Sequence, residues 1–170
     1  TISGLSHLEG QTVSVFADGA VQPQATVTGG TITLERVVPA HFEACLAKLE
    51  ETGCTVVREV DEVTITGPLR PRAVDVTTMP FPGFPTDMQA QLMALDCIAE
   101  GSSRVTETIF ENRYMHVQEL NRLGAAIDID GHTAIVHGVN RLVGAPVMAT
   151  DLRASASLVI AGLAAEGQTL

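Results

Sequence analysis

The chain has 170 residues, of which 45% are apolar and 18% charged, so its composition is that of a globular and not a disordered protein. A net charge of −10 and the absence of Trp disfavour nucleic acid as a partner. The longest apolar run, residues 158–165, is far shorter than the roughly 20 residues of a membrane span, and no apolar leader is present, so we expect a cytoplasmic protein.

The first 30 residues lack helical periodicity. Val13 and Val15 fit a short strand, and residues 17–19 (Ala-Asp-Gly) fit a turn. We therefore predict a β-rich segment over 1–30, either a hairpin laid against the rest of the chain or a foreign attachment. The stretch 4–21 resembles a β-rich segment of bacteriophage tail proteins, which would make the chain a hybrid.

Residues 31–170 contain a faint internal duplication. Glycines and one leucine recur 71 positions apart without a gap, and the glycines fall where turns and helix ends are expected. The pairs are Gly30 and Gly101, Leu49 and Leu120, Gly53 and Gly124, and Gly67 and Gly138. We predict one repeat over 31–100 and a second, incomplete one over 101–170.

Each copy shows the same order of predicted elements: a strand, a helix, two short strands, a third strand and a second helix. Phe42, Cys45, Leu46 and Leu49 lie on one face of the first helix, which closes at Gly53. The alternation indicates an α/β (α+β) architecture. The other predicted elements are strands 31–37, 55–59, 62–66 and 73–78 with helix 86–100, then strands 104–109, 126–129, 133–137 and 146–149 with helix 152–166.

The second helices are predicted to lie inside the fold. Residues 154–165 carry no charge, and a helix that is apolar nearly all round is normally buried on all sides. Sheets should then cover these helices, as in an inside-out α/β unit. The helix at 152–166 needs a cover, which would be the N-terminal segment, a missing part of the protein, or another chain in a homo-oligomer.

The cysteines and histidines show no ligand spacing. Cys45, Cys54 and Cys97 are odd in number and form no CxxC pair, so we expect free thiols in a reducing compartment. The five histidines match no HxH or HExxH pattern. We therefore expect no metal and no cofactor.

A rigid loop from Pro80 to Asp87 leads to the start of the first buried helix. Thr86 or Asp87 would serve there as a helix N-cap. Alternatively, Asp87 is a carboxylate held in a cleft, where it can accept a proton or bind a sugar hydroxyl.

The second copy has Asp151 and Arg153 at the corresponding helix start. Asp151 is a natural cap, but a cation is disfavoured near the positive end of a helix dipole. Arg153 either binds an anion together with the helix N-terminus or forms an ion pair with a carboxylate.

A third polar cluster, residues 107–116, joins a strand end to a helix. Connection residues are often polar without a function, so this cluster fits a capped helix start with surface charges. The alternative is that it forms part of a binding site.

Three blocks within these clusters resemble the UDP-N-acetylglucosamine enolpyruvyl transferase (MurA) family. They are residues 84–91 (FPTDMQAQ), 106–116 (TETIFENRYMH) and 147–157 (VMATDLRASAS), and the likeness extends over about 30–170. The resemblance implies a lobe of inside-out α/β units. It also implies transfer of enolpyruvyl from phosphoenolpyruvate to the 3-hydroxyl of the UDP-sugar, in peptidoglycan precursor synthesis.

The resemblance also implies roles for individual residues. Asp87 would hold the sugar and remove the hydroxyl proton, and Ile109, with Phe110 beside it, would touch the UDP-sugar through its backbone. Arg153 would bind phosphoenolpyruvate, and Asp151 would lie near the reacting centre.

Some features of the family have no counterpart in this chain. Its loop with the reactive Cys and its early Lys-Asn pair are absent, and Leu5-Ser6-His7 follows where Lys-Asn is expected. We therefore expect part of one lobe, inactive by itself, that binds UDP-N-acetylglucosamine and phosphoenolpyruvate at most weakly. The alternatives are a chimeric or designed scaffold without activity, and a subunit that becomes active with a complementary lobe.

Overall fold

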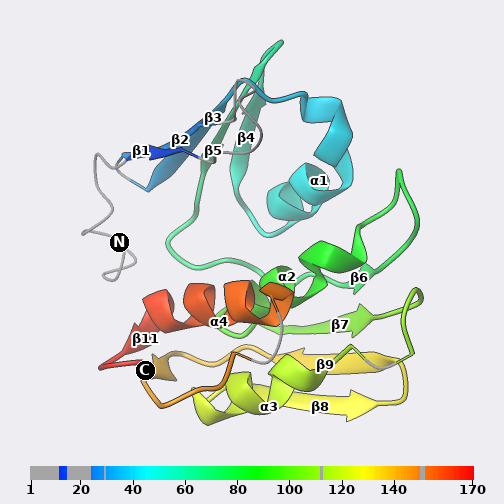
Figure 1. The fold of residues 1–170 in the computed structure, drawn as a ribbon, viewed down its shortest axis with the longest axis vertical. Helices are drawn as coiled ribbons and strands as arrows, with labels where there is room; N and C mark the ends of the chain where they lie inside the picture. Colours follow the sequence, from blue (N-terminus) through cyan, green and yellow to red (C-terminus); the bar gives the residue numbers. More distant parts are fainter. Residues whose placement is uncertain (1–11, 15–23, 29, 112, 150–151) are drawn as a thin grey trace. The chain divides into compact units, whose positions relative to one another are not determined.

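The structure is a computed structural model that describes residues 12–14, 24–28, 30–111, 113–149 and 152–170. Contacts divide the chain into two units, Thr1–Leu69 and Arg70–Leu170, each with its own sheet (Figure 1). Within the described ranges, no helix is long and apolar enough to cross a membrane.

Unit 1 is an antiparallel sheet of five strands in the order β1-β2-β3-β5-β4, with α1 packed beside β4 (Figure 1). Alternation in β3 and β5 places Leu34 opposite Val63 on one face and Thr33 opposite Thr64 on the other. The elements are β1 (Thr12–Ser14), β2 (Gln24–Thr28), β3 (Thr31–Glu35), the 3-10 helix η2 (Pro39–Phe42), α1 (Glu43–Glu51), β4 (Thr55–Arg58) and β5 (Glu62–Thr66).

The predicted β character of the N-terminal segment is confirmed for its described residues. Val13 lies in β1, and β2 pairs with β3 along its whole length, so residues 24–28 are an integral part of the unit 1 sheet. Val15 and the predicted turn at 17–19 lie outside the described residues.

Unit 2 contains a four-stranded sheet in the order β6-β7-β9-β8, in which β6 is parallel to β7 and the other pairs are antiparallel. The helix α2 packs against α4, which also contacts α3. The elements are β6 (Val76–Thr77), the 3-10 helix η3 (Thr86–Met88), α2 (Gln89–Asp96), β7 (Ser102–Thr106), α3 (Met115–Arg122), β8 (Ala126–Asp130), β9 (Thr133–His137), β10 (Leu142–Val143), α4 (Leu152–Ala164) and β11 (Ala165–Glu166).

The duplication recurs in the hydrogen bonding of both units. The series β3-α1-β4-β5 and β7-α3-β8-β9 have the same order and the same pairing, with the first strand beside the last. The Gly67 N–H donates to the Gly30 carbonyl, at 3.2 Å, as the Gly138 N–H donates to that of Gly101, at 2.9 Å. The repeated order of a strand, a helix and two strands is thereby confirmed. The division into domains at 1–30 and 31–170, with repeats at 31–100 and 101–170, stays a prediction.

Four predicted elements differ in the structure. The strand predicted at 104–109 is β7 and ends at Thr106, so residues 107–109 lie beyond it. Residues 146–149 form no strand: the Val147 N–H donates to the Leu170 carbonyl and the Met148 N–H to the Glu119 carboxylate, each at 3.0 Å, and the short strand is β10, at Leu142–Val143. The predicted strand 73–78 is reduced to Val76–Thr77. The predicted helix 86–100 begins as η3 and ends at Asp96, whose side chain accepts hydrogen bonds from Val74 and Ser103.

The prediction that the second helices are buried on all sides holds for only one of them. In α2, Leu92, Met93 and Ala94 are all buried. In α4, small residues at helical spacing form one buried face, whereas Val159 is 63% and Ile160 40% exposed. The exposed face of α4 is the one for which the sequence predicts a cover, and the described residues of this chain do not supply it. The buried residues of α4 are Ala154, Ser157, Leu158 and Ala161.

Candidate functional site

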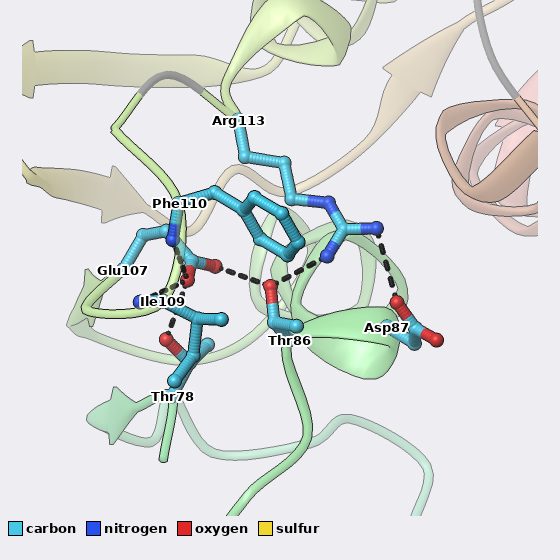
Figure 2. Close-up of polar contacts among 7 residues, drawn as sticks. All are labelled: Thr78, Thr86, Asp87, Glu107, Ile109, Phe110 and Arg113. Atoms are coloured by element: carbon cyan, nitrogen blue, oxygen red, sulfur yellow. Dashed lines mark hydrogen bonds and ion pairs between the residues drawn. The ribbon is translucent and has the colours of Figure 1, made fainter. Parts of the chain in front are cut away.

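Three segments of unit 2 meet at the ends of β6 and β7 (Figure 2). Because the two strands are parallel, Thr78 after β6 lies beside Thr108 after β7. The Thr108 N–H donates to the Thr78 hydroxyl at 2.9 Å, and the Thr78 N–H donates to the Thr106 carbonyl at 2.9 Å. The third segment is η3, which carries Thr86 and Asp87.

The carboxylate of Glu107 joins these segments. Glu107 is 1% exposed. Its Oε1 accepts hydrogen bonds from the Thr78 hydroxyl at 2.8 Å and from the N–H groups of Ile109 and Phe110 at 2.8 and 3.2 Å. Its Oε2 accepts a hydrogen bond from the Thr86 hydroxyl at 2.7 Å. Four donors thus compensate the charge of a buried carboxylate (Figure 2).

These hydrogen bonds determine the protonation state of Glu107. Burial by itself raises the pKa of this carboxyl, but the hydrogen bonds from Thr86, Ile109, Thr78 and Phe110 together outweigh burial and hold the pKa below its ordinary value of 4.5. Glu107 is therefore ionised at neutral pH.

The lowered pKa of Glu107 predicts a pH dependence of stability. A depressed pKa contributes stability that is fully present above the unfolded value and is lost as the pH falls through the lower, folded value. Glu107→Gln should therefore cost about 2 kcal/mol of unfolding free energy at pH 7, the order of a lost charged hydrogen bond. Urea denaturation at several pH values should show this cost shrinking below pH 4.5. A cost that is the same at pH 7 and pH 3 would contradict the assignment.

Arg113 extends the cluster to Asp87. Its Nη1 donates to the Thr86 hydroxyl oxygen at 2.7 Å, and its Nη2 donates to Asp87 Oδ1 at 3.0 Å. The guanidinium lies 4.7 Å from the centroid of the Phe110 ring, which is half exposed. The Asp87 side chain is 54% exposed, so its carboxylate is oriented by Arg113 and still accessible to a ligand (Figure 2).

The structure brings together three of the five site residues expected from the sequence. Asp87, Ile109 and Phe110 surround Arg113 and Glu107 (Figure 2). Asp151 and the side chain of Arg153 lie outside the described residues. The expectation that Thr86 or Asp87 caps a helix was wrong, since neither η3 nor α2 has a side-chain cap and the Thr86 hydroxyl donates to Glu107 instead.

The interpretation of residues 107–116 as a helix start with surface charges was also wrong. Glu107 is buried, and the buried Tyr114 hydroxyl accepts a hydrogen bond from the Glu107 N–H at 3.1 Å. Strand alternation carries the signal for this burial. Ser103, Val105 and Glu107 are two residues apart and all point inward, so the period of β7 predicts a buried glutamate one step after the strand.

The arrangement combines an accessible carboxylate, a cation, an aromatic ring and a turn with engaged N–H groups. Such a surface can accept hydrogen bonds from the hydroxyls of a polar ligand, and the carboxylate can accept a proton. The described residues contain no group of three or more potential metal ligands.

Comparisons with known proteins agree with one another. The EPSP synthase (3-phosphoshikimate 1-carboxyvinyltransferase) family matches residues 1–170. The UDP-N-acetylglucosamine 1-carboxyvinyltransferase of Xylella fastidiosa (strain 9a5c) is 53% identical over 176 aligned positions, which cover 99% of this chain and 41% of that protein. The chain thus spans less than half the length of this relative.

Solved structures show the same fold. The enolpyruvyl transferase NikO from Streptomyces tendae matches with a TM-score of 0.72 and 28% identity, over 81% of this chain and 33% of its own. The EPSP synthase of Acinetobacter baumannii matches with a TM-score of 0.57 and 21% identity, over 75% and 31% of the two chains, and supports the fold alone. The family match includes residues 1–30, so the comparisons give no support to a phage-derived segment or a hybrid.

Proposed function

Because the chain belongs to the EPSP synthase family of enolpyruvyl transferases, we propose that it carries part of the acceptor site for transfer of enolpyruvyl from phosphoenolpyruvate to UDP-N-acetylglucosamine. The observation that carries this proposal is the 53% identity, over 99% of the chain, to a protein named for this reaction. The exposed carboxylate of Asp87, held beside the Ile109–Phe110 turn, supports the same function.

Asp87 is the proposed proton acceptor. In the transfer, the 3-hydroxyl oxygen of the sugar forms a bond to C2 of phosphoenolpyruvate, the bond from C2 to the phosphate oxygen breaks, and phosphate leaves. The hydroxyl must lose its proton, and a carboxylate within hydrogen-bond reach can accept it. The ion pair with Arg113 at 3.0 Å fixes the direction of that carboxylate.

The Ile109–Phe110 turn is proposed to contact the sugar through acceptors. Both of its N–H groups already donate to Glu107. A backbone contact from this turn to a ligand must therefore use carbonyl oxygens, which accept hydrogen bonds from hydroxyl or acetamido N–H groups. A sugar bearing such donors fits this requirement better than a phosphate does.

Binding of phosphoenolpyruvate is assigned to residues outside the cluster of Glu107, Arg113 and Asp87. Arg153 is proposed to bind phosphoenolpyruvate, and Asp151 to lie near the reacting atoms. No residues here match the family's Cys loop or Lys-Asn pair. We therefore expect this chain to bind the acceptor without transferring enolpyruvyl, and to gain activity only with the complementary lobe.

A competition between acceptors tests the proposal. Calorimetric titration of the chain is expected to show binding of UDP-N-acetylglucosamine and weaker or no binding of shikimate 3-phosphate, the acceptor implied by the name of the family. Preference for shikimate 3-phosphate would overturn the assignment of the acceptor. Binding of neither compound would contradict an acceptor site in this chain.

A further inference from the structure

We propose that Glu107 is a positioning residue that sets the spacing of the two acceptor-contacting turns, Thr86–Asp87 and Ile109–Phe110. This inference rests on the proposed function, which makes these turns the ones that meet the sugar. Glu107 itself is buried and contacts the ligand through neither oxygen, because both are engaged within the protein.

One carboxylate binds both turns at once. Oε2 accepts the hydrogen bond from Thr86, 21 residues earlier in the chain, and Oε1 accepts those from Ile109 and Phe110. The Thr86 hydroxyl, having donated to Glu107, presents its oxygen to Arg113, which in turn binds Asp87. The carboxylate of Glu107 is thus connected to that of Asp87, the proposed contact to the substrate, through the side chains of Thr86 and Arg113 (Figure 2).

The isosteric amide cannot reproduce this arrangement. Glutamine replaces one acceptor oxygen by an NH2 group. If that NH2 group faces Ile109 and Phe110, it points its hydrogens at two N–H groups that also need an acceptor, and their hydrogen bonds are lost. If it faces Thr86, the Thr86 oxygen receives hydrogen bonds from both glutamine and Arg113, and its own proton loses the acceptor it has now. Either orientation loosens one turn relative to the other.

The chain offers a matched control in Asp96. This second buried carboxylate, 0% exposed, lies in the same unit at the other end of α2. It accepts hydrogen bonds from the Ser103 hydroxyl at 2.7 Å and from the Val74 N–H at 3.3 Å, away from the two turns. Asp96→Asn therefore removes a buried charge whose hydrogen bonds to Ser103 and Val74 lie outside the two turns.

The test measures ligand affinity and amide hydrogen exchange in the 170-residue chain. Glu107→Gln is expected to weaken binding of UDP-N-acetylglucosamine at least tenfold and to speed amide exchange at least tenfold in one of the two turns, at Ile109 and Phe110 or at Met88. Asp96→Asn is expected to lower the melting temperature while leaving both quantities within twofold of the wild type. These paired outcomes separate positioning from general destabilisation.

Thr86 supplies a second pair of variants in case Glu107→Gln does not fold. Thr86→Val keeps the shape but removes the hydroxyl between Glu107 and Arg113, and should also weaken binding at least tenfold. Thr86→Ser restores the hydroxyl and should recover most of that loss. Wild-type affinity in both Glu107→Gln and Thr86→Val would overturn the inference.

Absence of binding by the wild-type chain would count against the proposed function instead. The exchange rates then decide the positioning by themselves. Faster exchange in Glu107→Gln, at Ile109 and Phe110 in one turn or at Met88 in the other, supports it, and unchanged exchange in both turns overturns it.

Discussion

Gly138→Ala is expected to destabilise unit 2 by about 3 kcal/mol, at the upper end of the usual cost of overpacking. A Cβ at Gly138 would overlap the carbonyl oxygen of Ala99 and lie 2.8 Å from its carbonyl carbon. These are backbone atoms, which cannot move aside as the tip of a side chain can. The same residue donates its N–H to Gly101, so a shift of the backbone also weakens the hydrogen bond that joins the end of β9 to the turn before β7.

The internal repeat provides the control for this variant. Gly67 occupies the equivalent position of unit 1 and donates the equivalent hydrogen bond, to Gly30. A Cβ there would meet nothing closer than 3.9 Å. Thermal denaturation should therefore show a large loss for Gly138→Ala and less than about 1 kcal/mol for Gly67→Ala. Equal losses would contradict the close approach of residue 138 to Ala99.

Asp87→Asn is expected to have the largest effect on function. It should weaken binding of UDP-N-acetylglucosamine at least tenfold in this chain. In the complete transferase it should lower the rate of enolpyruvyl transfer by about 10² to 10⁴, the usual contribution of a general base. Stability should change by less than about 1 kcal/mol, because the side chain is half exposed and its ion pair with Arg113 is accessible to solvent.

Asp128→Asn is the matched control for Asp87→Asn. Asp128 is an exposed aspartate on β8, outside the site. The substitution Asp128→Asn removes the same negative charge as Asp87→Asn, so any general electrostatic effect on an anionic ligand is common to both variants. Steady-state kinetics and calorimetry should show a loss for Asp87→Asn alone. Equal losses in the two variants would remove Asp87 from its proposed role.

Much of the fold could be predicted from local patterns. Two of these patterns follow from local backbone geometry and are found in the structure. They are the alternation of strands 31–35 and 62–66 and the glycines that recur 71 positions apart. The resemblance of residues 84–91 and 106–116 to a known family pointed to the two turns of the candidate site. Local patterns do not predict hydrogen bonds between residues that are far apart in the sequence. Met148, in a predicted strand, instead donates its N–H to Glu119, 29 residues away in sequence.

Burial is the second property that local sequence patterns do not determine. A uniformly apolar helix predicts burial on every side, yet Val159 and Ile160 of α4 are exposed in this chain. A charged residue in a connection predicts the surface, yet Glu107 is buried because four donors converge on it from three segments. Such convergence depends on tertiary structure, and only the inward alternation of β7 pointed to it.

The measurement that tests the account most directly is a map of amide chemical-shift changes as UDP-N-acetylglucosamine is added to the 170-residue chain. We expect the largest changes at Thr86, Asp87, Ile109 and Phe110, which the Glu107 carboxylate and Arg113 link together. Changes elsewhere in unit 2 should be small. Saturable binding whose largest shifts avoid these residues would contradict the account.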